Sequence, residues 1–154
     1  MNGVSHIIGG VTAAAVLGIH SPAPLAIVVV ASLLPDIDRS NSLLGRFIPL
    51  LPSLLEKVPG KRTVTHSLLL GAGLWFIIQA MSPGWALAFA VGYGSHLLLD
   101  LFTGYVALLW PLPIKFGVPL FGIPPFAIEV AAIACWGAWV ATGGYLLFLN
   151  MLHA

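Results

Sequence analysis

Residues 92–103 read GYGSHLLLDLFT and lie inside an apolar run that extends from Trp85 to Trp110. Within this run, His96 and Asp100 are four residues apart. On an α-helix, that spacing places both side chains on one face, about one turn apart. An unpaired carboxylate is costly in hydrocarbon, so the pair needs a physical reason. An intrahelical hydrogen bond, a polar contact between helices and a shared metal ion are the candidate reasons.

The composition is that of an integral membrane protein. The chain has 154 residues, of which 59% are hydrophobic and 7% charged, and its mean hydropathy is +1.03. Soluble domains usually have about a quarter of their residues charged. The length predicts a single integral membrane domain over residues 1–154, with the lipid bilayer as its partner. The formal net charge of +1, without a dense basic cluster, argues against a nucleic-acid partner.

Proline and glycine divide the apolar sequence into about five helices. The first two, about 4–19 and 25–35, are short and are separated by Ser21-Pro22-Ala23-Pro24. They either span the membrane as a hairpin or re-enter it. The pattern predicts an all-α fold, a polytopic membrane helical bundle. The other expected segments are helices at 64–82, 85–110 and 126–150, and an irregular loop with five prolines at 111–125.

Residues 36–62 form the polar segment, in which charges alternate with leucines and three prolines limit any helix. This pattern predicts an interfacial loop. Five of the six lysines and arginines lie in 39–62, and the sixth is Lys115. The positive-inside rule therefore places both of these loops in the cytoplasm, and the expected location is the cytoplasmic (inner) membrane.

The ionisable side chains gather toward the cytoplasmic ends of the expected helices. Histidine nitrogens together with carboxylate oxygens suit a divalent transition metal, so we expect one or two ions, with zinc ahead of manganese or iron. Asp36 and Asp38 share a face only in extended backbone, which Pro35 favours. Asp36 would then bind metal while Asp38 acts as a base or orients a histidine. The gathered residues are His6, Asp36, Asp38, His66, His96, Asp100 and Glu129.

Simpler roles are open for three of the charged residues. Asp38 could pair with Arg39 or Arg62 at the surface. Glu129 could be a helix N-terminal charge that the helix dipole favours. Arg62 could hold a phosphate or carboxylate, or could anchor the chain at the membrane interface.

Five blocks of this sequence resemble the YdjM-like family of inner-membrane proteins, for which metal-dependent hydrolysis has been inferred. The blocks occur in order and at similar spacing over about residues 5–130. They are SHIIGG at 5–10, LLPDID at 33–38, GKRTVTHSLL at 60–69, GYGSHLLLDLFT at 92–103 and LLWP at 108–111. The resemblance implies a helical membrane protein whose histidines and aspartates bind metal. It extends to His6, Asp36, Asp38, His66, His96, Asp100, Arg62 and Glu129.

Two positions depart from the family pattern. Before the THS block the family often has His-Arg-Gly, where this chain has Lys61-Arg62-Thr63. After PDID the family commonly has histidine, where this chain has Arg39. The number of metal ions is therefore open.

The leading hypothesis is a metal-dependent hydrolase that acts on a lipid or lipid-linked ester or phosphoester at the cytoplasmic face. A metal would activate water and polarise the scissile bond. Asp38 or Glu129 would accept the water's proton, and Arg62 would hold an anionic group. The expected metal ligands are His6, Asp36, His66, His96 and Asp100.

Two hypotheses from other classes compete with hydrolysis. A metal or proton transporter would use intramembrane His and Asp residues, but too few polar residues cross the expected spans to line a path. A non-catalytic scaffold would hold a structural metal, but four ligands complete such a site and this chain offers more. The sequence specifies neither the substrate nor the oligomeric state.

Overall fold

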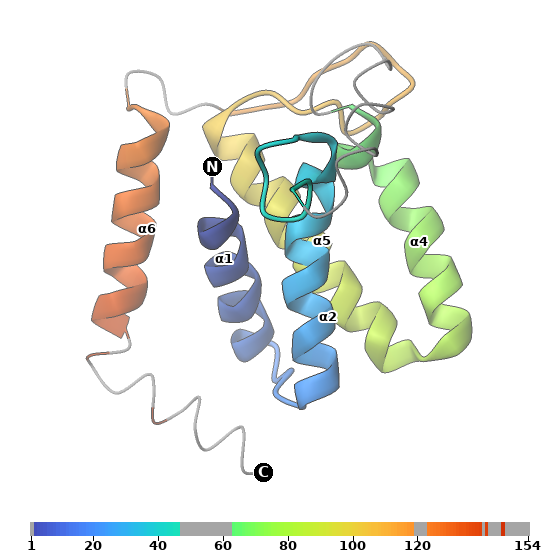
Figure 1. Cartoon of the computed structure of the whole chain (residues 1–154), viewed down its shortest axis with the longest axis horizontal. Coiled ribbons are helices and arrows are strands. Elements are labelled where there is room, and N and C mark those ends of the chain that lie inside the picture. The colour runs from blue at the N-terminus through green and yellow to red at the C-terminus, as the bar shows by residue number, and fades with distance from the viewer. Residues whose placement is uncertain (1, 47–62, 119–122, 140, 142–145, 147–154) are drawn as a thin grey trace.

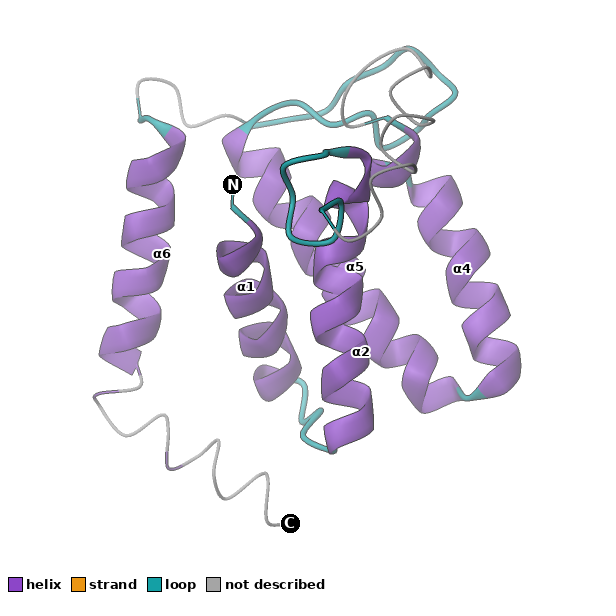
Figure 2. Ribbon diagram, viewed as in Figure 1, coloured by secondary structure: helices purple, strands orange, loops and turns teal. Residues whose placement is uncertain are grey.

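The computed structural model describes residues 2–46, 63–118, 123–139, 141 and 146. Within these ranges the protein is α-helical and contains no β-strand, which confirms the expected all-α class (Figure 2). The α-helices are α1 (Gly3–Val16), α2 (Pro22–Leu33), α4 (Leu68–Met81), α5 (Pro83–Thr103) and α6 (Pro125–Trp139), and the 3-10 helices are η1 (Leu34–Asp38) and η2 (Val64–His66).

Successive α-helices alternate in direction (Figure 1). The start of α1, the end of α2, the start of α4 and the end of α5 therefore lie at one end of the molecule. Helix α5 is central, because α1, α2 and α4 all pack on it, and its contact with α2 is the most extensive. Helix α6 lies beside α1 (Figure 1). This alternation brings residues that are 30 or more positions apart in sequence to the same end.

Local sequence explains where the helices begin. The Asn2 side chain accepts a hydrogen bond from the Ser5 backbone N–H, and the Ser67 hydroxyl accepts one from that of Leu70. Both contacts are N-caps, which satisfy a backbone donor that has no partner inside the helix. Helices α2 and α5 instead carry a proline in the first turn, where its missing N–H costs nothing.

Gly92 lets α5 approach α2 closely. A Cβ atom at this position would collide with the Val28 carbonyl oxygen of α2. Gly94, two residues along the same helix, has no atom within 4 Å of the corresponding position. The two glycines therefore form a matched pair in which only the first is required by packing.

We expect Gly92→Ala to destabilise the fold, because α2 must move away from α5, and overpacking typically costs about 1–3 kcal/mol. Gly94→Ala should leave the midpoint of thermal unfolding unchanged or raise it, since alanine favours a helix over glycine by up to about 1 kcal/mol. Thermal unfolding of the purified variants measures both effects. Equal midpoints would contradict the assignment of Gly92 to the α2–α5 contact.

The helix expected over 85–110 begins earlier and ends earlier, because α5 runs from Pro83 to Thr103. Beyond Gly104 the chain turns back, and Val106 and Phe116 exchange two backbone hydrogen bonds of 2.7 and 2.8 Å. The Leu108 carbonyl also accepts a 2.8 Å hydrogen bond from the Leu68 N–H at the start of α4. These partners replace the intrahelical bonds that residues 104–110 would have made.

Two further local expectations were wrong. Residues 36–38 are not extended, because the backbone continues from α2 into the 3-10 helix η1. His66 belongs to η2 and precedes α4, so it does not lie on a regular helix. Residues 47–62, which make up most of the expected interfacial loop, lie outside the described residues. The same holds for most of the expected continuation of the last helix toward residue 150.

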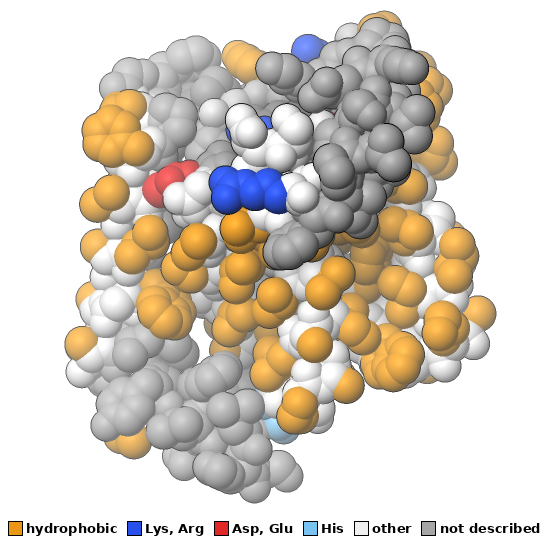
Figure 3. Space-filling view, viewed as in Figure 1, with side chains coloured by type: hydrophobic (Ala, Val, Ile, Leu, Met, Phe, Trp, Pro, Cys, Tyr) orange, Lys and Arg blue, Asp and Glu red, His pale blue; other side chains and the backbone are white. Residues whose placement is uncertain are grey.

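On the face shown in Figure 3, the described helices carry mostly apolar side chains. Large hydrophobic side chains such as Phe76 and Met81 on α4 and Phe126 on α6 are two-thirds or more exposed, at 67%, 70% and 67%. Of the described helices, α5 alone is long and apolar enough to cross a membrane by length and composition, while α1 and α4 are shorter apolar helices. The ionisable side chains that matter below are, in contrast, inside.

Candidate metal centre

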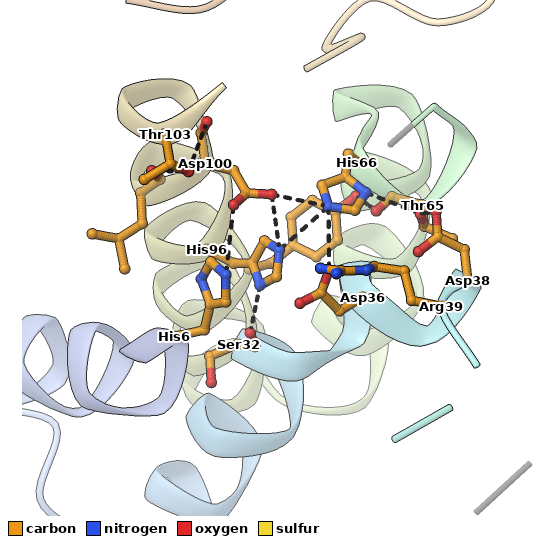
Figure 4. Close-up of polar contacts among 12 residues, drawn as sticks. His6, Ser32, Asp36, Asp38, Arg39, Thr65, His66, His96, Asp100 and Thr103 are labelled. Carbon is orange, nitrogen blue, oxygen red and sulfur yellow. Dashed lines mark hydrogen bonds and ion pairs between the residues drawn. The ribbon is translucent and has the colours of Figure 1, made fainter. Parts of the chain in front are cut away.

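His96 and Asp100 project from one face of α5, as their spacing predicts, and both are fully buried (Figure 4). His96 Nε2 lies 3.6 Å from the nearer carboxylate oxygen, Asp100 Oδ2. That separation is longer than a hydrogen bond. A direct intrahelical hydrogen bond therefore does not account for the pair.

His66 joins this pair from η2 and is also fully buried. Its Nε2 atom lies 3.2 Å from Asp100 Oδ2 and 3.4 Å from His96 Nε2. Together with the 3.6 Å separation on α5, these distances make a closed triangle of two nitrogens and one oxygen. We call His66, His96 and Asp100 the ligand triangle.

The outer ring nitrogens of both histidines have partners that require a hydrogen on Nδ1. His96 Nδ1 is 2.7 Å from the Ser32 carbonyl, which can only accept, so Nδ1 must donate its hydrogen. His66 Nδ1 is 3.1 Å from the Thr65 hydroxyl, which itself donates to Asp38 Oδ2 at 3.1 Å. The hydroxyl hydrogen is thereby used, so His66 Nδ1 donates as well. In neutral histidines, both Nε2 atoms then carry lone pairs that point into the triangle.

Three lone-pair donors that face one another in a buried space repel unless a proton or a metal cation lies among them. Zinc–nitrogen and zinc–oxygen bonds are about 2.0–2.2 Å, so neighbouring donors on a tetrahedral ion are about 3.3–3.6 Å apart. The triangle's sides of 3.2, 3.4 and 3.6 Å agree with this spacing. The residues present therefore fit a divalent metal ion, and the hydrogen bonds behind the rings are those that metal-binding histidines usually make.

His6 and Asp36 lie beside the ligand triangle (Figure 4). The His6 ring stacks on His96 with a centroid separation of 3.7 Å, and His6 Nε2 is 3.6 Å from Asp100 Oδ1. Within the described part of the chain, neither His6 nitrogen has a hydrogen-bond partner, although the side chain is fully buried. Asp36 Oδ1 is 4.0 Å from His66 Nε2. Ligand atoms of His6, Asp36 and His96 also lie within 4.8 Å of one another, so this second group could hold an ion too.

The 3-10 geometry of η1 separates the two aspartates that the sequence grouped together. With about three residues per turn, positions two apart point in different directions. Asp36 consequently faces the histidines, while Asp38 lies behind His66 and reaches it through Thr65 (Figure 4). Tyr93 supports this arrangement, because its hydroxyl lies 2.8 Å from the carbonyls of both Thr65 and Ser67.

Glu129 lies against Asn2, at the start of α1, and not among the candidate metal ligands. Its carboxylate accepts hydrogen bonds from the Asn2 backbone N–H at 2.6 Å and from the Asn2 side chain at 3.1 Å. It belongs to neither group of closely spaced ligand atoms among the described residues. Arg62 and Lys61 lie outside the described residues.

Sequence reasoning assigned no site role to Thr65, Ser32 or Arg39. Arg39 Nη1 lies 3.5 Å from Asp36 Oδ1, at the edge of the site. The position of Thr65 directly before the candidate ligand His66 could have indicated that its hydroxyl orients the histidine. The Ser32 contact was not predictable, since it uses a backbone carbonyl that every residue carries.

The fold and the site together define a class: a helical protein, apolar on its surface, with buried His and Asp groups at one end that could hold a metal ion. The chain belongs to the YdjM family of inner membrane proteins, because a profile described as "YdjM inner membrane protein" matches residues 1–154. The resemblance of the sequence blocks is thereby confirmed.

Individual relatives agree with this assignment. "Uncharacterized protein YvsG" of Bacillus subtilis is 37% identical over 128 residues, which cover 79% of this chain and 80% of the relative. "Inner membrane protein YdjM" of Escherichia coli and that of Shigella flexneri are each 30% identical over 125 residues, or 73% of this chain. The chain spans 63% of the length of these two relatives. No solved structure matches.

Proposed function

We propose that this chain is a metal-dependent hydrolase of the inner membrane that acts on a lipid or lipid-linked ester or phosphoester at the cytoplasmic face. In this proposal, residues 1–154 form one polytopic membrane bundle. The observation that supports it most is the ligand triangle, in which three buried lone-pair donors converge at the spacing of metal ligands.

The distribution of polarity supports a membrane orientation with the site toward the cytoplasm. The basic residues Arg39, Arg46 and Lys115 belong to segments at the same end of the molecule as the ligand triangle (Figure 1). Basic side chains favour the cytoplasmic side. Large exposed apolar side chains, among them Val16, Phe76 and Met81, cover the helices, as expected of surfaces that face lipid.

The buried polar side chains support a one-sided site rather than a transport path. Among the described residues, they are Ser5, His6, Ser32, Asp36, Thr63, Thr65, His66, Ser67, His96 and Asp100. All belong to the helix ends that meet at the site. A path across the membrane would need such groups along its whole length.

The residues have distinct roles in the proposed reaction. His66, His96 and Asp100 hold the metal, which supplies Lewis-acid chemistry and makes water a stronger acid. Asp36 faces the same space and either accepts the water's proton or, with His6, holds a second ion. Zinc suits two nitrogens and one oxygen, and manganese or iron are alternatives.

The remaining charged residues have supporting roles in the proposal. Asp38 orients His66 through the Thr65 hydroxyl, which contacts Nδ1 of the ring, whereas Nε2 faces His96 and Asp100. Glu129 holds α6 against the start of α1 through Asn2. Arg62 binds an anionic part of the substrate, as the sequence suggests.

Metal analysis followed by a substrate panel tests the proposal. We expect purified protein to contain about one or two equivalents of a divalent transition metal. The loaded protein should hydrolyse at least one member of a panel of phosphatidic acid, phosphatidylglycerol, a polyprenyl phosphate and soluble aryl esters and phosphoesters. A chelator-treated sample is the control. Fully loaded protein that cleaves none of these compounds would argue for the scaffold alternative.

Cysteine labelling tests the orientation. Ser40 is exposed and follows η1 directly. We expect a Cys introduced by Ser40→Cys in a Cys135→Ala background to react with a membrane-impermeant maleimide only after the cells are opened. Labelling of intact cells from outside would reverse the proposed topology.

A further inference from the structure

An apolar groove of about 380 Å³ lies between α2 and α4. Its walls are one face of α2 and η1 and, on α4, Leu74 and Ile78. The residues on the first wall are Ala26, Ile27, Val30, Ala31 and Leu34. Phe89 of α5 lies between these walls. The groove is lined by hydrophobic side chains alone, and its size is within the range of ligand pockets.

Residues that line the groove are close in sequence to residues of the candidate metal centre. Leu34 lines it and is also the first residue of η1, which carries Asp36 two residues later. A chain segment of two residues spans at most about 7 Å, so the backbone of Asp36 lies within about 7 Å of that of Leu34. Ala31, another lining residue, directly precedes Ser32, whose carbonyl orients His96. A ligand that fills the groove therefore has one end beside the site residues.

A cation lies at the same end. The Arg39 side chain is 46% exposed, and its guanidinium lies 3.5 Å from the Asp36 carboxylate (Figure 4). An exposed guanidinium can bind a phosphate with two parallel hydrogen bonds. The combination of a hydrocarbon groove, a guanidinium and a metal site matches a molecule with an acyl tail and an anionic phosphate head.

We infer that the groove between α2 and α4 binds one acyl chain of an anionic phospholipid whose headgroup faces Arg39. This inference rests on the proposed function, since it assigns the path by which the lipid substrate reaches the site. A second apolar groove of about 340 Å³ lies on α4 beside Trp110. We assign the lipid to the first groove because Arg39 directly follows η1, whose first residue, Leu34, lines that groove.

Photochemical labelling in bilayers tests the acyl path. The protein is reconstituted in phosphatidylethanolamine–phosphatidylglycerol vesicles that contain a phosphatidylglycerol with a diazirine on its acyl chain, and attachment sites are mapped by mass spectrometry. We expect labelling at Phe89 and Ile78 to exceed that at Phe76, which is exposed on α4 outside both grooves.

Two substitutions to tryptophan form a matched comparison. Val30 lines the groove and is 55% exposed, so Val30→Trp fills the groove without entering the core. Because each buried methylene contributes about fourfold to lipid binding, displacing two should lower labelling at Phe89 roughly 15-fold. Ala72→Trp, at an exposed position of α4 outside both grooves, should leave that labelling unchanged.

The headgroup is tested with Arg39→Gln. This variant should reduce labelling by the phosphatidylglycerol probe and leave labelling by a matched phosphatidylcholine probe unchanged. Uniform labelling of all exposed apolar residues would overturn the inference, and so would labelling concentrated at Trp110 or an unchanged yield in Val30→Trp.

The outcome is separable from that of the proposed function, because labelling needs neither metal nor turnover. Groove labelling in a protein that binds no metal and cleaves no substrate would retain the acyl path and reject the hydrolase. Phospholipid hydrolysis together with uniform labelling would retain the hydrolase and reject the acyl path.

Discussion

Replacing His96 and Asp100 together with alanine is expected to abolish stoichiometric metal binding. The double variant removes two of the three donors in the ligand triangle and leaves only His66 in place. His96 also belongs to the second group, with His6 and Asp36, so neither group of closely spaced ligand atoms keeps three donors. The metal content of the purified protein should therefore fall from about one or two equivalents to near zero. Elemental analysis by mass spectrometry measures this directly and does not depend on knowing a substrate.

The control for this experiment is His20→Ala, which removes a histidine outside the cluster. His20 belongs to neither group of closely spaced ligand atoms among the described residues. Its metal content should equal that of the wild-type protein. Asp100→Asn is a second test variant, because it preserves the shape of the side chain while it removes the negative charge. Undiminished metal in the double variant would reject the metal centre altogether.

The second large effect is expected at the pair of aspartates in η1. Asp38→Asn should retain the metal but weaken its affinity or the rate of hydrolysis by about 10–100-fold, the usual cost of losing a partner that orients a metal-binding histidine. Thr65→Val should have the same effect, because Asp38 reaches His66 only through the Thr65 hydroxyl. The double variant should be no worse than either single variant, since both break one chain of hydrogen bonds. Metal titration and hydrolysis assays measure these effects.

Asp36→Asn provides the contrast. Its carboxylate faces the histidines directly, so its loss should lower hydrolysis by about a hundredfold or more, and a second metal ion should be lost if two are bound. Ser40→Ala, an exposed polar change just beyond η1, is the matched control and should change nothing. Additive effects of Asp38→Asn and Thr65→Val would mean that Asp38 acts independently of His66.

The gathering of the site residues at one end could be predicted from the sequence because it depends on simple rules. Proline and glycine give the number of helices, successive helices that are expected to cross one membrane alternate in direction, and four-residue spacing gives the shared face of His96 and Asp100. These rules specify depth along the bundle. They do not specify the position around it, and this is why Glu129 was expected near the histidines but lies against Asn2.

The local backbone at η1 and η2 was not predictable for a different reason. Pro35 is compatible with both an extended segment and the first turn of a 3-10 helix, so φ alone does not choose between them. Tertiary contacts decide, because the Thr65 hydroxyl donates a hydrogen bond to Asp38 and His66 lies beside Asp36 in the observed geometry. The division of labour between Asp36 and Asp38 therefore depends on packing between segments that are 27 or more residues apart.

The lengths of the helices have a consequence for the surrounding lipid. Helices α1 and α2 contain 14 and 12 residues and are about 21 and 18 Å long, while α5 has 21 residues and is about 31 Å long. A bilayer has a hydrocarbon thickness of about 30 Å. In the proposed orientation α5 matches this thickness, whereas the α1–α2 hairpin is too short by about a third. Such hydrophobic mismatch is relieved by local thinning of the bilayer. The headgroup layer would then dip toward the hairpin that supplies His6 and Asp36, so the membrane itself would deform to meet the buried site.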